Sequence, residues 1–159
     1  TDISGAQFNP FVSLAMYLTK RIKGKLLIIY IPSQIFGCLF GVMLANVFFE
    51  HDIIELSTKS RDGLNIFLAE VVATFGLVFI IFATIKDGKT IVAACVATYI
   101  TAGYWFTSST SFANPAVAIA RTFTESFTGI NYLNTPTYIV AELIGALIAV
   151  FLIKKLILK

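Results

Sequence analysis

The chain is 159 residues long, which suits one modest domain, but its composition excludes an ordinary soluble protein. Hydrophobic residues make up 57% of the sequence and charged residues only 13%, against roughly 45–50% and 25% in globular proteins, so too few charges are present to cover a water-facing surface. The formal net charge of +3 comes from basic clusters between apolar blocks, which argues against a nucleic-acid partner.

Six apolar segments are predicted to form helices. In chain order they are Asn9–Thr19, Leu26–Phe49, Leu64–Ile85, Thr90–Phe106, Asn114–Thr124 and Tyr138–Ile157. All but the first and fifth approach the ~20 residues that a helix needs to cross a hydrocarbon core of about 30 Å. The first and fifth have eleven residues each, which as a helix is about 16 Å, or half a membrane. The sequence therefore predicts an all-α integral membrane protein with four full transmembrane helices and two half-helices.

The charged residues predict the orientation of these helices. If the spans alternate in direction, one side of the membrane receives nine of the twelve basic residues: Lys20, Arg21, Lys23, Lys25, Lys86, Lys89, Lys154, Lys155 and Lys159. Most of the acidic residues fall on the opposite side. Lysine and arginine are enriched in cytoplasmic loops, so the basic side is predicted to face the cytoplasm, with the protein in the cell membrane.

Each short segment opens with Asn-Pro. Proline suits the first turn of a helix and asparagine is a strong N-cap, so one such pair indicates no more than a helix start. Here the pair recurs within an internal repeat, with Asn9 and Asn114 lying 105 residues apart. The helices that follow share a spacing of tyrosine, a polar residue and glycine at an offset of 108, as Tyr30, Gln34 and Gly37 and again as Tyr138, Glu142 and Gly145. The sequence therefore predicts two equivalent units.

The two units are predicted to lie inverted in the membrane, so that the half-helices enter from opposite faces and their N-termini meet near the midplane. Two positive helix ends at that point would oppose cations and protons, but not a neutral molecule. Each asparagine amide would donate a hydrogen bond to a passing oxygen. This pattern predicts a passive channel for small uncharged solutes that excludes ions.

Three stretches carry a resemblance to a known family. Ser4-Gly-Ala-Gln-Phe-Asn-Pro-Phe-Val-Ser13 and Ser111-Phe-Ala-Asn-Pro-Ala-Val117 resemble the two signature loops of the aquaporin, or major intrinsic protein, family. Ala69-Glu-Val-Val-Ala-Thr-Phe75 resembles the motif that opens each repeat of that family. The resemblance implies six spans and two half-helices per subunit, one pore per subunit, and a homotetramer in the lipid bilayer.

The chain starts at Thr1, in the middle of a motif, so we expect that the first two of the six spans are missing. Residues 1–159 are then a single aquaporin-like channel domain, in which 1–49 end the first repeat and 64–159 form the second. By position, the resemblance assigns these pore residues: Asn9, Pro10, Phe11, Asn114, Pro115 and Ala116. It also makes Glu70 a buried carboxylate that accepts hydrogen bonds from loop backbone. Glu142 occupies the place of Gln34 in the repeat, and we expect it to reach toward the outer interface.

Three positions depart from the family pattern. Phe11 replaces an alanine and either narrows the pore centre or packs against neighbouring helices, of which packing is favoured. Gln7 stands where the family usually has histidine and keeps a polar group there. Val117 stands where water-specific and glycerol-passing members usually carry arginine.

These departures bear on the outer constriction, which the resemblance builds from Val117, Ser111 and either Ala102 or Gly103. All are small and neutral, so the constriction is expected to be wide and to suit a solute larger than water. Arg121 lies four residues after Val117 on the same helix face. It either stands one turn further along the path or anchors the half-helix to nearby carbonyl or carboxylate groups.

The stretch from Phe106 to Arg121 is most similar to bacterial aquaporins of arsenic-resistance operons, which share the valine. Arsenite therefore joins water and glycerol as a candidate solute. The alternatives are a water-selective pore, against which Val117 weighs, and a non-conducting structural homologue with Phe11 as a plug. An enzyme is not expected, because the sequence has no Ser/His/Asp set, no metal-ligand cluster and no phosphate loop. No metal and no cofactor are expected.

Overall fold

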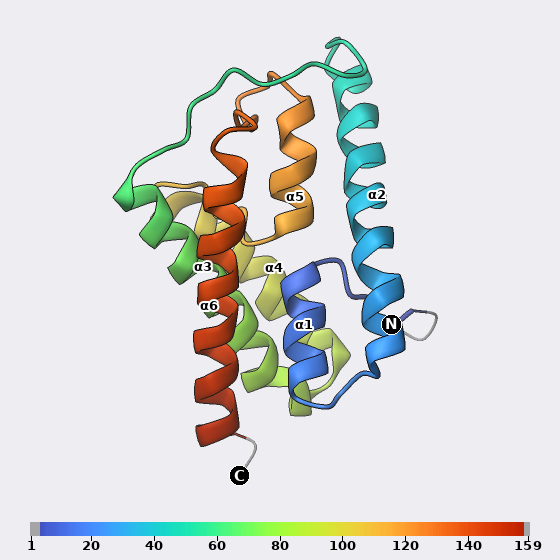
Figure 1. The fold of residues 1–159 in the computed structure, drawn as a ribbon. Helices are drawn as coiled ribbons and strands as arrows, with labels where there is room; N and C mark the ends of the chain where they lie inside the picture. Colours follow the sequence, from blue (N-terminus) through green and yellow to red (C-terminus); the bar gives the residue numbers. More distant parts are fainter. Residues whose placement is uncertain (1–3, 158–159) are drawn as a thin grey trace.

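The computed structural model describes residues 4–157, and every regular element within that range is helical (Figure 1). In chain order the elements are α1 (Pro10–Leu18), α2 (Gly24–Phe48), α3 (Leu64–Thr84), the 3-10 turn η1 (Ile85–Asp87), α4 (Lys89–Phe106), α5 (Pro115–Ala120), the 3-10 turn η2 (Arg121–Phe123) and α6 (Thr135–Leu156). The prediction of an all-α chain is confirmed, and the four long helices lie close to their predicted boundaries.

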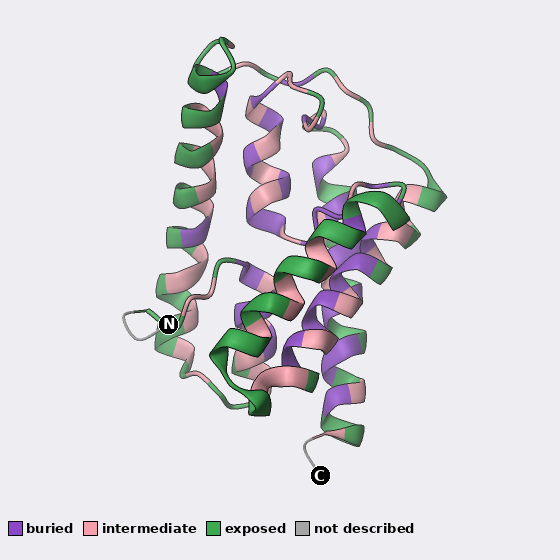
Figure 2. Ribbon diagram, turned by 180° about the vertical axis from the view of Figure 1, so that it is seen from behind, coloured by how far each residue is buried: buried purple, intermediate pink, exposed green. Residues whose placement is uncertain are grey.

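Three helical segments are long and apolar enough to cross a membrane, namely Gly24–Phe48, Leu64–Asp87 and Thr135–Leu156. The sequence predicts α4 as a fourth span, but this 18-residue helix falls outside that set. Lysine, threonine and tyrosine side chains interrupt its apolar residues and lower its mean hydropathy. Along α2, large apolar side chains such as Phe36 and Phe40 are exposed, as expected for a surface that faces lipid (Figure 2).

The two half-helices α1 and α5 lie one beyond the other, with their N-termini turned toward the middle of the molecule (Figure 1). Each begins at an asparagine cap. Asn9 Oδ1 accepts hydrogen bonds from the backbone N–H of Phe11 (2.9 Å) and of Val12 (3.4 Å), and Asn114 Oδ1 accepts one from Ala116 (3.1 Å). Because the side-chain oxygens satisfy first-turn N–H groups, each Asn-Pro pair defines the start of its half-helix.

The second half-helix is shorter than the predicted Asn114–Thr124. Its α-helical part ends at Ala120, and a 3-10 turn continues to Phe123. The carbonyls of this turn are engaged by other segments: Ser57 N–H donates to Thr122 (2.9 Å) and the Asn46 side chain donates to Phe123 (2.9 Å). Since these carbonyl groups accept hydrogen bonds from other segments, the backbone adopts a 3-10 turn after Ala120 and the α-helix ends there.

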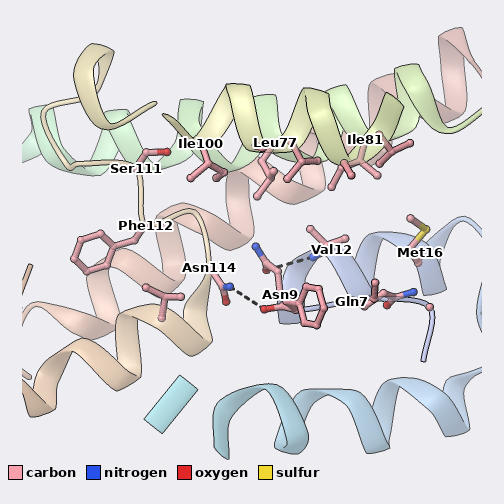
Figure 3. A pocket seen from close by; sticks show the side chains of 18 of the residues that line it. Gln7, Asn9, Val12, Met16, Leu77, Ile81, Ile100, Ser111, Phe112 and Asn114 are labelled. Carbon is pink, nitrogen blue, oxygen red and sulfur yellow. Dashed lines mark hydrogen bonds between the residues drawn. The ribbon is translucent and has the colours of Figure 1, made fainter. Parts of the chain in front are cut away.

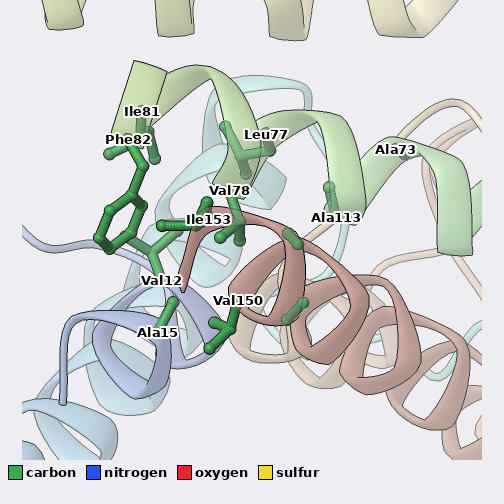
Figure 4. Close-up of a cluster of buried hydrophobic side chains, with 12 residues drawn as sticks. Val12, Ala15, Ala73, Leu77, Val78, Ile81, Phe82, Ala113, Val150 and Ile153 are labelled. Atoms are coloured by element: carbon green, nitrogen blue, oxygen red, sulfur yellow. The ribbon is translucent and has the colours of Figure 1, made fainter. Parts of the chain in front are cut away.

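The core lies between α3, α6 and α1 (Figure 4). Val78 and Ala149 are completely buried at the contact of α3 with α6, and Ala15 of α1 is 1% exposed beside them. Gly145 allows the two long helices to approach, because a Cβ atom on it would lie 2.3 Å from the carbonyl oxygen of Val71. Small residues at such a contact bring helix backbones close together, which stabilises packing within a membrane.

The internal repeat is visible in equivalent hydrogen bonds. The Tyr30 hydroxyl donates to the carbonyl oxygen of Ser4 (2.7 Å), and the Tyr138 hydroxyl donates to that of Ser109 (3.5 Å). Each tyrosine thus holds the start of the loop that leads into its own half-helix. The α1–α2 connection, the α3–α4 turn and the end of α6, which carry the lysine clusters, lie at the same end of the molecule (Figure 1). This arrangement agrees with the predicted gathering of basic residues on one side.

At the opposite end, Glu125 joins the loop after α5 to the loop between α2 and α3. Its carboxylate accepts hydrogen bonds from the Thr58 backbone N–H (2.7 Å) and hydroxyl (2.8 Å) and lies 3.3 Å from Lys59 Nζ. These donors, the Thr58 backbone first among them, lower the pKa of Glu125 from 4.5 to about 2.

We expect the junction at Glu125 to weaken in acid. A carboxyl group whose pKa is lowered by folding stabilises the fold above its unfolded pKa, and this stabilisation is lost as pH falls from about 4.5 toward 2. Hydrogen exchange of residues 50–63, corrected for intrinsic rates, should show protection at pH 6 that declines by pH 3. The E125Q variant should lack this protection at both pH values; protection equal to the wild type at pH 6 would show that the carboxylate does not hold the loops.

Candidate functional site

A cavity of about 650 Å³ runs beside the meeting point of the half-helices (Figure 3). One wall is apolar and comes from α3 and α4, through Leu77, Ile81, Val92, Val96 and Ile100. The facing wall comes from α1 and the loops that precede α1 and α5, and it carries the polar side chains of Gln7, Asn9 and Asn114. The cavity thus has an apolar side and a polar side along its length.

The two cap asparagines cross-link the half-helices. Asn9 Nδ2 donates to the carbonyl oxygen of Ala113 (2.6 Å), and Asn114 Nδ2 donates to that of Phe8 (2.9 Å). Each amide therefore binds the residue that precedes the other asparagine. A side-chain amide nitrogen carries two hydrogens, and the bond between the loops uses one of them. The second N–H of each asparagine can therefore donate to another acceptor. Both side chains line the cavity.

Glu70 of α3 holds the loop before α5 in place. Its side chain is 0% exposed, and its two carboxylate oxygens accept the backbone N–H groups of Phe112 (2.9 Å) and Ala113 (2.8 Å). Ala113 has a φ of 47°, a left-handed conformation that is uncommon for alanine. The paired hydrogen bonds stabilise that backbone and so set the direction in which Asn114 enters the cavity.

The expectation that Glu142 reaches toward the outer interface is wrong. Its side chain is 0% exposed, and Oε1 accepts the backbone N–H of Asn114 (2.9 Å). The loop before α5 has several buried N–H groups without helical partners, and an inward carboxylate satisfies one of them. Gln34 plays a comparable part in the first repeat, where its Nε2 donates to the Gln7 carbonyl oxygen and to Ser13 Oγ, both at 2.9 Å.

The other residues of the two Asn-Pro motifs do not line the main cavity. They line a second, apolar cavity of about 210 Å³ between α1, α2, α5 and α6, and comprise Pro10, Phe11, Pro115 and Ala116. Phe11 is half-buried there and also packs against the core cluster. The structure therefore places Phe11 in helix packing, and Asn9 and Asn114 on the solute-sized cavity.

The predicted constriction residues are only partly brought together. Val117 and Ser111 line the main cavity, whereas Ala102 and Gly103 do not. Ala102 is exposed on α4. Gly103 is buried against Ser111, because a Cβ atom on it would lie 2.6 Å from Ser111 Oγ. Glycine at this position thus makes room for the serine side chain.

Arg121 lines the same cavity, and its partner was not foreseen from the sequence. Its Nη2 donates to the hydroxyl of Tyr104 on α4 (2.6 Å), and its Cζ lies 4.3 Å from the ring centroid of Phe112. Its hydrogen bond therefore goes to a hydroxyl rather than to a carbonyl or a carboxylate. Tyr104 and Phe112 also line the cavity. Neither stands in a pattern that sequence reasoning could single out, since only the folded chain brings Tyr104 of α4 to Arg121 at the start of η2.

Comparison with known proteins agrees with this geometry. The sequence profile described as "Major intrinsic protein" matches residues 1–104. Over 152 residues the chain is 45% identical to aquaglyceroporin AqpS of Rhizobium meliloti (strain 1021), covering 96% of this chain and 65% of that protein. It is 29% identical over 159 residues to Aquaporin-4 of Bos taurus, covering 92% and 48%, and 32% identical over 97 residues to Aquaporin-B of Dictyostelium discoideum, covering 54% and 33%.

The chain spans less than two thirds of the length of each of these relatives. The prediction that it is not an enzyme agrees with its similarity to channel proteins. Three of its helical segments are long and apolar enough to cross a membrane, so it is an integral membrane protein. The match over most of its length and the 45% identity show that the chain belongs to the major intrinsic protein family.

Proposed function

We propose that the protein is a passive channel of the cell membrane for small uncharged solutes. The observation that carries this proposal is the pair of asparagine amides, Asn9 and Asn114, that meet on one cavity at the N-termini of opposed half-helices. Each amide has one N–H beyond its mutual bond, which a solute oxygen can accept. A solute would therefore exchange hydrogen bonds with water for hydrogen bonds at the centre of the protein.

The charges around the cavity support the exclusion of cations. Lys89 and Arg121 are the charged side chains among the described lining residues, and both are basic. The N-termini of α1 and α5 add positive partial charge where the two helices meet. A cation would leave water without finding a carboxylate along this wall, so its transfer is disfavoured.

The shape of the cavity supports solutes larger than water. An apolar wall opposite a polar one suits a polyol, whose carbon chain and hydroxyl groups differ in the same way. Val117 and Ser111, which both line the cavity, have small neutral side chains. Glycerol is thus the favoured solute. Water and arsenite, which is also an uncharged hydroxide, are proposed as further solutes. The proposed assembly is a homotetramer.

A water-selective pore and a non-conducting homologue are the two competing functions. A water-selective pore is disfavoured because Val117 stands where water-specific members usually carry arginine. The second requires Phe11 to act as a plug, and Phe11 lies in the apolar cavity between α1, α2, α5 and α6 rather than on the main cavity. Measurement of flux separates all three.

Stopped-flow light scattering on proteoliposomes that contain the protein tests the proposal. Under a glycerol gradient we expect the vesicles to reswell several-fold faster than protein-free vesicles, and under a sucrose gradient to shrink faster. Fast shrinkage without glycerol entry would indicate a water-selective pore instead. Rates equal to those of empty vesicles, with protein shown to be folded by circular dichroism, would contradict the channel.

A further inference from the structure

Two buried carboxyl groups meet beside the loop that precedes α5. Glu70 of α3 accepts the backbone N–H groups of Phe112 (2.9 Å) and Ala113 (2.8 Å). Glu142 of α6 accepts the next backbone N–H, that of Asn114 (2.9 Å). Both glutamates are 0% exposed, and their side chains are in hydrogen-bond contact with each other. Three successive N–H groups are therefore bound by two acidic side chains that touch.

One of the four carboxyl oxygens has no donor. The two oxygens of Glu70 and Oε1 of Glu142 accept backbone N–H groups, whereas Glu142 Oε2 is buried and has no hydrogen-bond partner among residues 4–157. Two ionised carboxylates can only accept hydrogen bonds, and they repel each other strongly where water is excluded. A proton on Oε2 would turn this oxygen into a donor to the neighbouring carboxylate and remove the repulsion.

The donors around the pair are unequally divided, which indicates where the proton lies. Glu70 receives two backbone N–H groups and is also in hydrogen-bond contact with the Ser109 hydroxyl. Among the described residues, one backbone N–H donates to Glu142. Donors stabilise the ionised form of a carboxyl group. The negative charge is therefore better placed on Glu70, and the proton on Glu142.

No basic side chain in the described part of the chain neutralises the pair. Arg61 lies over the Phe112 ring, but it donates to two carbonyl oxygens of the loop before α6 and forms no ion pair with either glutamate. The hydroxyls of Tyr99 and Tyr138, which face the pair, donate to backbone carbonyl oxygens instead. Since no cation balances two negative charges here, a shared proton is the remaining way to reduce them to one.

The first repeat has a neutral side chain at the equivalent place. The amide nitrogen of Gln34 donates to the Gln7 carbonyl oxygen and to Ser13 Oγ, both at 2.9 Å. A protonated carboxyl group resembles an amide, because one of its oxygens accepts and the other donates. Glu142 with a proton therefore has the hydrogen-bonding capacity of Gln34, which an ionised glutamate lacks.

We infer that Glu142 is a neutral carboxylic acid that donates a hydrogen bond from Oε2 to Glu70, so that the two side chains form one clamp with a single negative charge. Glu142 is then a positioning residue for Asn114, because its accepting oxygen keeps its place only while the two carboxyl groups attract each other. The inference goes beyond the proposed channel, since it concerns the charge inside the protein and requires no solute.

Infrared spectroscopy of the purified protein in liposomes at neutral pH detects such a proton directly. The carbonyl stretch of a protonated carboxyl group lies apart from the bands of carboxylates and of the backbone, and it shifts in D₂O. Glu70 and Glu142 are the buried acidic residues of the described chain, so a band at neutral pH is assigned to them. We expect this band in the wild type and its loss in E142Q. E50Q is the control, because Glu50 is exposed and its substitution should leave the band unchanged.

Resistance to unfolding by SDS, followed by circular dichroism, gives a second readout. E142Q keeps an acceptor oxygen for the Asn114 N–H and replaces the O–H donor by an N–H donor, so it should unfold at the same SDS concentration as the wild type. E142A removes both groups and should unfold at a lower concentration. Rescue by glutamine would show that a neutral group is sufficient at this position.

Two results would overturn the inference. A wild type without the protonated-carboxyl band, with E142Q more stable than the wild type, would show that both glutamates are ionised and repel. E142Q that is as unstable as E142A would show that the loop requires a charge on Glu142. If neither variant folds, the wild-type spectrum decides, and absence of the band rejects the shared proton. A wild type that shows the band but no solute flux would contradict the proposed channel and leave the clamp standing.

Discussion

Replacing Glu70 by alanine is expected to destabilise the protein by about 2–5 kcal/mol, because two buried backbone N–H groups lose their acceptors. The carboxylate is 0% exposed and accepts from Phe112 at 2.9 Å and from Ala113 at 2.8 Å. Without it, the left-handed backbone at Ala113 loses its support, and Asn114 loses its position at the cavity. Resistance to unfolding by SDS, followed by circular dichroism, measures the first effect, and glycerol flux measures the second.

The E70Q variant distinguishes the two hydrogen bonds from simple filling of space. Glutamine keeps one acceptor oxygen but places a donor against the other N–H group, so an intermediate loss of stability is expected. D52A is a suitable control, since Asp52 is exposed in the loop between α2 and α3. Wild-type stability in E70A would mean that the loop before α5 holds its conformation without Glu70.

Substitution of Gly145 by alanine is expected to separate α3 from α6 and to lower stability by about 1–3 kcal/mol. The added Cβ would lie 2.3 Å from the carbonyl oxygen of Val71 and 2.9 Å from the backbone nitrogen of Phe75. Both are backbone atoms of α3, which cannot rotate away as a side chain can. The shift would also move Glu142, one turn earlier on α6, away from Asn114. Thermal unfolding in detergent measures the loss.

Leu147→Ala provides the comparison on the same helix. Leu147 is 45% exposed and lies outside the core cluster, so its truncation should leave the unfolding temperature nearly unchanged. A larger substitution at Gly145, such as leucine, should prevent folding. If G145A unfolds at the wild-type temperature, the close approach of α3 and α6 does not limit stability.

Much of this fold could be predicted because its signals are local. Asn-Pro contains both the cap and the first helical residue, so Asn9 and Asn114 identify two helix starts without knowledge of the rest. The lengths of the apolar segments predict the long helices. The lysine clusters predict which helix ends lie on the same side of the membrane. The repeat then relates Tyr30 to Tyr138, which make equivalent hydrogen bonds.

The predictions fail where the position of a residue depends on a contact with a segment that is distant in the sequence. Nothing near Glu142 in the sequence indicates that the Asn114 backbone, 28 residues earlier, needs an acceptor. The early end of α5 depends on Ser57 and Asn46, which belong to the outer loop and to α2. For the same reason Tyr104 was missed. Either Ala102 or Gly103 was predicted at the constriction, and neither lines the main cavity. Long-range hydrogen bonds decide the positions of Glu142, the end of α5 and Tyr104, whereas Gly103 is placed by its packing against Ser111.

The mutual bonds of the asparagines also bear on how the protein is made. Asn9 and Ala113 are separated by 104 positions, so α1 emerges from the ribosome long before its partner exists. At about 5–20 residues per second, that interval lasts roughly 5–20 seconds. During this time the first half-helix is present without the contacts that complete its end. The contact between the two half-helices is thus among the last to form. A substitution that disrupts the loop before α1 or the loop before α5 would remove contacts from both half-helices.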